Sequence, residues 1–246
     1  IFSCADTGNN TVRLIVTDVA GNKDSATAIV RVVDQTAPLA IARNITVYLN
    51  AGGTATITAA DVDNGSSDNC SIMSRTLDKT TFNCTNTGNN LVHLTVTDSS
   101  GNSSFAQALV TVLDTVRPVV MTRNLTRYLN ASGTASITAA DVDNGSSDNC
   151  GITTRTIDKS SFNCVDTGIN TVTLTVTDGS GNSRSATAVV TVRDTIRPVL
   201  VVRNPTIYLN AGGTATLTVA DVNNGSSDNC GIQSMSLSKT TFDCSD

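Results

Sequence analysis

A ten-residue segment recurs at a spacing of 80 residues, and this period constrains the fold more than any other feature of the sequence. The run Asp61-Val-Asp-Asn-Gly-Ser-Ser-Asp-Asn-Cys70 returns unchanged at 141–150, and it returns at 221–230 with Asn223 in place of Asp. Cysteines, tyrosines and an Asp-to-Pro segment recur with the same period. Self-similarity at a fixed period indicates a tandem array, so we expect copies of one small module.

The Asp-to-Pro segments are the expected module boundaries. They read Asp34-Gln-Thr-Ala-Pro38, Asp114-Thr-Val-Arg-Pro118 and Asp194-Thr-Ile-Arg-Pro198. These boundaries predict the C-terminal part of a module at 1–34, whole modules at 35–114 and 115–194, and the N-terminal part of a module at 195–246. The sequence favours a window of a longer chain. A second hypothesis is strand complementation, in which the 195–246 head of one molecule is completed by the 1–34 tail of another.

Period-2 alternation predicts β-strands. Residues 171–177 alternate Thr with Val172, Leu174 and Val176, which places the three apolar side chains inward. A turn at 178–182 and a second alternating run at 186–192 complete a predicted hairpin. Another hairpin is expected from Tyr208, through the turn at 210–213, into 214–218. About seven short strands per module, with no helical period, predict an all-β fold: tandem immunoglobulin-like β-sandwich modules of 80 residues, each with two antiparallel sheets, forming a rod or fibre.

Charge and composition exclude several function classes. The net charge is −5 and no run of Lys or Arg occurs, so nucleic acid is not an expected partner. No apolar stretch reaches the roughly 18 residues that a membrane span needs. The single histidine, His93, lies at an outward phase of a predicted strand without a recurring nucleophile or carboxylate beside it. We therefore expect no enzymatic activity.

Seven cysteines without a C-x-x-C motif favour disulfides over metal thiolates. The pairs predicted within modules are Cys70–Cys84, Cys150–Cys164 and Cys230–Cys244, each closing a loop of about 15 residues that is worth about 3 kcal/mol. The partner of Cys4 is then expected outside the chain. The alternative is pairing between neighbouring modules, such as Cys84 with Cys150. In either case the protein is expected in an oxidising compartment, extracellular or on the cell surface.

The recurring acidic loop carries ligands of the type that calcium prefers. Carboxylates cluster there with hydroxyl and amide oxygens, although the spacing is not that of an EF-hand. The favoured alternative is a tight turn at Asn144-Gly145 with the acids capping backbone groups. Junction aspartates, Asp34, Asp114 and Asp194, could add ligands. No cofactor is required by the sequence, and the calcium candidates are Asp61, Asp63, Asp68, Asp141, Asp143, Asp148, Asp221 and Asp228.

Two kinds of signal predict covalent glycans. Asn-x-Ser/Thr sequons give the candidates Asn44, Asn64, Asn102, Asn124, Asn144 and Asn224. Asp followed by Ser or Thr and an apolar residue resembles the O-glycosylation signal of Bacteroidota, and this pattern gives the candidates Ser25, Thr115 and Thr195. A sugar coat on the module surface is therefore a prediction of the sequence.

The sequence resembles hyalin-repeat-like immunoglobulin-like modules. The resemblance rests on Asp-Asn-Cys-Gly at 148–151, on the strand and turn at 171–182 and on the Val-x-Asp-x-x-x-Pro linker at 192–198. The family's usual cysteines are absent at 120–121 and 185–186. The closest likeness is to tandem arrays in large secreted surface proteins of Bacteroidota, including gliding and adhesion proteins.

The resemblance implies a structural repeat of an extracellular fibre or cell-surface stalk. The partners expected are copies of the same module. The alternative function is an adhesin that recognises a surface glycan or protein through its repeated loops. Near-identity of the loops between copies fits both functions, so the sequence leaves the alternative open.

Overall fold

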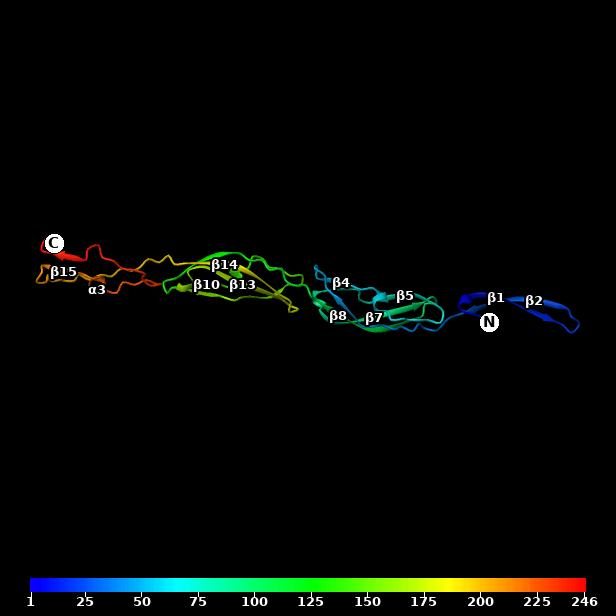
Figure 1. The fold of residues 1–246 in the computed structure, drawn as a ribbon. Coiled ribbons are helices and arrows are strands. Elements are labelled where there is room, and N and C mark those ends of the chain that lie inside the picture. Colours follow the sequence, from blue (N-terminus) through cyan, green and yellow to red (C-terminus); the bar gives the residue numbers. More distant parts are fainter. The chain divides into compact units, whose positions relative to one another are not determined.

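The computed structural model describes all 246 residues, which form two compact units, Ile1–Val116 and Arg117–Asp246. Each unit contains one complete sandwich module together with part of another copy of the repeat. The fold is all-β apart from single helical turns, as the sequence predicts (Figure 1). No helix is long and apolar enough to span a bilayer.

In the first unit, a four-stranded sheet and a two-stranded sheet form the complete module. The larger sheet has the order β3 (Ile45–Tyr48), β8 (Ser103–Leu113), β7 (Gly88–Asp98) and β5 (Ile72–Leu77). The smaller sheet pairs β4 (Thr54–Thr56) with β6 (Thr81–Asn83). Two short helical turns connect these strands, α1 (Ala59–Val62) and the 3-10 turn η2 (Cys84–Asn86).

The long hairpin β7–β8 supplies the centre of the core. Val92, Leu94 and Val96 on β7 are all 0% exposed, and so are Val110 and Val112 on the paired strand. Their polar neighbours in sequence point outward, which is the alternation predicted from the sequence. The core of this module is therefore mainly aliphatic, with Phe82 as its buried aromatic side chain.

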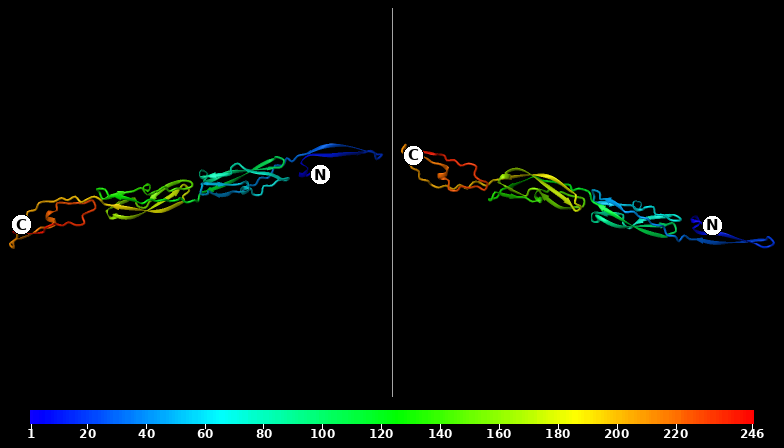
Figure 2. Two further views of the ribbon diagram at one scale, coloured as in Figure 1. Left: turned by 90° about the horizontal axis from the view of Figure 1, so that it is seen from above. Right: turned by 60° about the horizontal axis from the view of Figure 1, so that its bottom comes forward.

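Residues 1–34 form a hairpin of the same type without a sheet to join. The 3-10 turn η1 (Cys4–Asp6) precedes β1 (Gly8–Thr17), which pairs only with β2 (Lys23–Val32). Both views in Figure 2 show this ribbon at the N-terminal end without a further strand beside it. Leu14, which has the repeat phase of Leu94, is 67% exposed instead of 0%. The inward face of this hairpin is thus uncovered.

The second unit repeats the arrangement. Its complete module has the sheet order β11 (Ile152–Ile157), β13 (Gly168–Asp178), β14 (Ser183–Arg193) and β9 (Leu125–Tyr128). The remaining elements are β10 (Thr134–Ser136), α2 (Ala139–Val142), β12 (Ser161–Asn163), η3 (Cys164–Asp166), β15 (Thr214–Thr216), α3 (Val219–Val222) and β16 (Thr241–Asp243). Val172, Leu174 and Val176 are fully buried, and the hairpin β13–β14 confirms the one predicted from 171–192.

Two details of the predicted sheets are wrong. Strands β3 and β8 are parallel, so the larger sheet is mixed. The turn expected after Tyr208 exists, with Asn210 accepting from Thr214 N at 3.2 Å, but β15 pairs with β16 and not with the segment before the turn. In the complete modules, the equivalent segment β3 instead covers the free edge of β8, whose backbone groups would otherwise lack partners.

Candidate functional site at the module junction

Disulfides tie consecutive copies of the repeat to each other. Cys4 in the 1–34 hairpin bonds to Cys70 in the module at 35–114, and Cys164 bonds to Cys230 in the segment at 195–246. In both pairs the cysteines are 66 residues apart, with Cα atoms separated by 5.3 Å. Cys84 and Cys150 are also disulfide-bonded, and Cys244 is free and exposed.

The predicted pairings within modules, Cys70–Cys84, Cys150–Cys164 and Cys230–Cys244, are therefore wrong, and so is the partner of Cys4 outside the chain. The cause is the length of β7. Cys70 follows Asp68, whose carboxylate lies beside that of Asp98 at the end of β7, whereas Cys84 directly precedes the start of that strand at Gly88. An eleven-residue strand is about 35 Å long, which is far beyond the reach of a disulfide.

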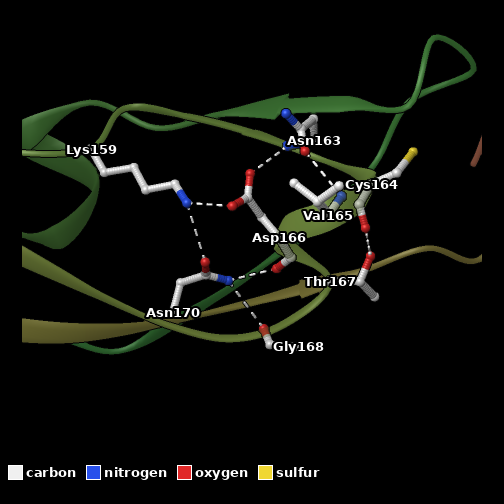
Figure 3. A network of polar contacts seen from close by, with 8 residues as sticks. All are labelled: Lys159, Asn163, Cys164, Val165, Asp166, Thr167, Gly168 and Asn170. Atoms are coloured by element: carbon white, nitrogen blue, oxygen red, sulfur yellow. Dashed lines mark hydrogen bonds and ion pairs between the residues drawn. The ribbon is translucent and has the colours of Figure 1, made fainter.

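A polar network fixes the turn that presents Cys164 (Figure 3). Asn163 N donates to Asp166 Oδ2 at 2.9 Å, and Val165 N donates to Asn163 Oδ1 at 3.0 Å. Lys159 Nζ forms an ion pair with Asp166 and donates to Asn170 Oδ1 at 3.4 Å. The pKa of Asp166 is lowered by the hydrogen bond from Lys159 and by the one from Asn163 N–H. The side chains around the cysteine thus hold its turn in place.

Residues of two copies also meet around the Cys164–Cys230 bond. Asn229 Nδ2 donates to Asn130 O at 3.3 Å and to Asp194 Oδ1 at 3.1 Å. Gly133 approaches the bond so closely that an added Cβ would lie 2.7 Å from both Cys164 Sγ and Asn229 O. The sequence of one copy is therefore adapted to the close approach of the next.

The acidic loop does not act as one cluster, because its aspartates have separate partners. Asp61, Asp141 and Asp221 occupy the N3 position of capping boxes and accept from Thr58, Thr138 and Thr218. The hydrogen bonds from these threonines lower the pKa of each carboxyl. These three side chains fix the start of each helical turn, as the alternative interpretation predicts.

Asp63 and Asp143 hold the turn that follows. Each accepts from a serine hydroxyl three residues later, Ser66 or Ser146, and each pairs with an arginine, at 3.1 Å from Arg75 or 2.9 Å from Arg155. Burial raises the pKa of these two carboxyls, but the hydrogen bonds from serine and the arginine charge outweigh it and lower the pKa. The carboxylates of Asp63 and Asp143, which the sequence analysis gives as calcium candidates, are thus already bound by serine and arginine side chains.

The last aspartate of the loop belongs to a different cluster. Asp68 Oδ2 accepts from Cys70 N at 2.8 Å and from Ser71 N at 3.0 Å, while its Oδ1 is buried without a hydrogen-bond partner. One carboxylate oxygen each from Asp34, Asp68 and Asp98 lie within 4.8 Å of one another. We call this group the junction triad. It unites the linker, the acidic loop and the β7–β8 turn.

Asp98, which the sequence analysis did not single out, is the most buried member of the junction triad. It is 0% exposed, and its Oδ1 accepts from Ser100 N at 2.9 Å and Asn102 N at 2.8 Å. Burial raises its pKa, but these bonds and the one from the Asn102 side chain lower it. The sequence analysis placed only its equivalent in the next copy, Asp178, in the turn predicted at 178–182. The signal that would have identified Asp98 is its 80-residue recurrence as Asp18 and Asp178.

The glycan candidates occupy different environments. Asn64, Asn144, Asn224, Thr115 and Thr195 are exposed. Asn44 and Asn124 are exposed as well, and their Oδ1 atoms accept from Leu109 N and Val189 N. Ser25 accepts from Arg13, and Asn102 is part of the junction.

His93 pairs with Asp78 at 2.8 Å on the outer face of β7 and is partly exposed.

No protein-family model matches the chain, and no curated protein matches it. Solved structures with a similar arrangement include protocadherin gamma B7 extracellular cadherin domains 1–4 (TM-score 0.33, 12% identity, 92% of this chain and 68% of that one). PcdhgB3 EC1-4 matches with a TM-score of 0.34 and 12% identity, over 80% of this chain and 61% of that one. Titin domains I67–I69 match with a TM-score of 0.40 and 10% identity, over 75% of each chain. The chain thus spans less than two thirds of PcdhgB3 EC1-4. Similarity this weak carries no argument about function.

Proposed function

We propose that the chain is a structural repeat segment of an extracellular fibre or cell-surface stalk, whose consecutive modules are tied covalently across their linkers. The observation that carries this proposal is the pair of disulfides Cys4–Cys70 and Cys164–Cys230, which join residues that the 80-residue period assigns to consecutive copies. Disulfides of this kind also fit an oxidising, extracellular location.

Disulfides between copies suit a protein that transmits tension. When the chain is pulled, force passes from Cys4 to Cys70 through the sulfur atoms, so the backbone between them carries no load. A linker alone would stretch as soon as the contacts around it broke. A disulfide prevents the two copies from separating until a covalent bond breaks, which is the property that a stalk requires.

Single-molecule stretching of the full chain tests this proposal. The 66-residue separation corresponds to about 230 Å of extended chain, so the Cys4→Ser/Cys70→Ser variant should release that additional contour length. Cys244→Ser is the matched control, because Cys244 is free and should leave the contour length unchanged. Equal contour lengths for the wild type and the double variant would overturn the proposal.

Copies of the repeat are also the proposed partners. The segment at 195–246 has an apolar groove of about 370 Å³, lined by Val199, Val222, Ile232 and Leu237 among others. In the complete module of the same unit, the residue at the phase of Val222 is Val142, which is 0% exposed beneath the β13–β14 hairpin. We assign the groove to a hairpin like β1–β2, whose inward residues Leu14 and Val16 are 67% and 60% exposed.

Sedimentation of the 246-residue chain over a range of concentrations tests this assignment. The wild type should assemble end to end, and Leu14→Asp should prevent assembly because it puts a charge on the face that must be buried. Arg13→Asp is the control, since Arg13 lies on the opposite face of β1. A wild type that stays monomeric at all concentrations, or a Leu14→Asp variant that assembles normally, would overturn the assignment.

Membership in the hyalin-repeat-like modules of Bacteroidota surface proteins, and a coat of covalent glycans, are further parts of the proposal. They are supported by the linker, strand and Asp-Asn-Cys motifs and by the exposed sequons at Asn64, Asn144 and Asn224. The adhesin function, with a glycan or a protein as ligand of the repeated loops, stays a prediction of the sequence.

A further inference from the structure

We infer that the junction triad, Asp34, Asp68 and Asp98, is a calcium site that fastens the linker to the module after it. The three aspartates come from distant parts of the repeat, and the fold brings one oxygen of each within 4.8 Å of the other two. The ligand set differs from the one expected from the sequence, because Asp61 and Asp63 serve the helical turn and the serine turn instead.

The charges of the junction triad are not balanced by the protein. None of the ion pairs in the structure includes Asp34, Asp68 or Asp98. Asp98 is 0% exposed, so water screens its charge poorly. Three carboxylates this close repel one another, and a divalent cation between them would convert that repulsion into attraction.

The second observation is a set of buried oxygens without donors. Asp34 Oδ2 and Asp68 Oδ1 are buried and have no hydrogen-bond partner. The other oxygen of each carboxylate is held by backbone N–H groups, from Thr36 at 3.1 Å and from Cys70 at 2.8 Å. Each side chain is therefore oriented by one oxygen, and the other oxygen is available to a ligand.

The same pattern recurs in the second unit. Asp148 Oδ1, Asp228 Oδ1 and Asn229 Oδ1 are buried without hydrogen-bond partners, and these atoms have the repeat phase of the Asp68-Asn69 pair. All are acceptors and none is a donor. Native proteins rarely leave buried polar atoms unpartnered, so a recurring set of orphaned oxygens points to a recurring ligand that is positively charged.

The chemistry of the donors favours calcium over other cations. All of the ligands are oxygens, whereas zinc prefers nitrogen and sulfur. Calcium binds oxygen at 2.3–2.6 Å, so three oxygens that lie within 4.8 Å of one another can all contact one ion. Ligands on two loops and a linker give the irregular geometry that calcium accepts and that magnesium, with its strict octahedron, does not.

Calcium would act beside the disulfide. Asp68 is two residues before Cys70. The same loop would therefore be bonded to the preceding copy by the Cys4–Cys70 disulfide and to the linker by the calcium ion. Asn102 Nδ2 already donates to Asp34 O at 3.1 Å and to Asp98 Oδ2 at 2.7 Å, which brings the linker to the turn. This inference depends on the geometry of the junction and not on the fibre function.

Calorimetry of the full chain tests the site, with calcium chloride or EDTA as the only variable. Calcium at millimolar concentration should raise the melting temperature of the wild type by several degrees, with an affinity of about 10⁻⁴–10⁻³ M. Asp68→Asn should bind one calcium ion fewer per chain. In EDTA the variant should be at least as stable as the wild type, because one of three repelling charges is gone.

Asp18→Asn is the matched control. Asp18 has the repeat phase of Asp98 and accepts the same hydrogen bonds from Ala20 and Asn22, but it is exposed and outside the junction triad. This variant should keep the full calcium response. Equal melting temperatures of the wild type in calcium and EDTA would overturn the inference. A calcium response unchanged in Asp68→Asn, or a loss of stability of that variant in EDTA, would also overturn it, since such a loss would indicate a merely structural role.

Discussion

Cys4 and Cys70 are joined by a disulfide with their Cα atoms 5.3 Å apart, although the 80-residue period places them in consecutive copies of the repeat. The bond therefore crosses the linker that contains Asp34, and its second cysteine lies two residues after Asp68 of the junction triad. The loop that contains Asp68 and Cys70 thus takes part in both the disulfide and the junction triad. The motif Asp-Asn-Cys at 68–70 and 228–230 is thus a junction element, and not part of a ring within one module.

Loss of the disulfide should weaken the attachment of the 1–34 hairpin. Closing a loop of 66 residues is worth about 4 kcal/mol in the loop-entropy model, so Cys4→Ser/Cys70→Ser should reduce the free energy of unfolding by up to that amount. Urea unfolding followed by circular dichroism measures the change. Cys244→Ser, which removes the free cysteine, should change the free energy by less than about 0.5 kcal/mol. A similar loss in both variants would contradict the assigned pairing.

Two leucines at the same repeat phase should respond differently to truncation. Leu94→Ala removes a fully buried side chain from the centre of the core and should cost about 2–5 kcal/mol. Leu14→Ala, at a position 67% exposed, should cost less than about 1 kcal/mol in the monomeric chain. Thermal unfolding at low protein concentration measures both. A large loss for Leu14→Ala under these conditions would show that the hairpin face is covered within a single molecule.

The strands could be predicted from the sequence more directly than the junction between copies could. The alternation of Val172, Leu174 and Val176 between threonines is local, and it predicted both the strand and its buried face. Sheet partners are not local: β3 pairs with β8, 65 residues later along the chain, and no periodicity encodes that pairing. The disulfides depend on which end of a module each cysteine occupies, and that depends on the eleven-residue length of β7.

Gly133 should be essential to the Cys164–Cys230 junction. Its φ of 71° already disfavours a side chain, and an added Cβ would meet Cys164 Sγ and Asn229 O at 2.7 Å. Gly145 has a comparable φ of 87° but nothing within 4 Å of its Cβ position, which makes Gly145→Ala the matched control. Backbone strain of about 1–2 kcal/mol should affect both variants. Only Gly133→Ala should also lower the fraction of the oxidised Cys164–Cys230 peptide in a non-reducing digest, and equal oxidation in the two variants would contradict this.

The capping aspartates should make stability depend on acid pH. Hydrogen bonds from Thr138 lower the pKa of Asp141 in the folded protein, so folding is favoured while this carboxyl is ionised in both states. That contribution is complete above the unfolded pKa of about 3.9, and it is lost as the pH falls through the lower folded pKa. The free energy of unfolding should therefore decrease below about pH 4. Asp141→Asn should show a smaller decrease than the wild type, and parallel pH profiles would exclude this role.

Glycans, if the producing cell attaches them at sequons, should avoid the junction. Asn102 Nδ2 is the atom that would carry the sugar, and it donates to Asp34 O at 3.1 Å and to Asp98 Oδ2 at 2.7 Å in a partly buried position. Attachment there would replace a hydrogen-bonding hydrogen with a bulky group and displace the linker. Asn64, at the exposed tip of the acidic loop, has no such constraint.

Glycopeptide mass spectrometry of the native protein should find sugar at Asn64 and its equivalents Asn144 and Asn224, and unmodified Asn102. A glycan at Asn102 on folded, disulfide-bonded protein would contradict the junction geometry, because the linker and the sugar cannot both occupy that side of the turn.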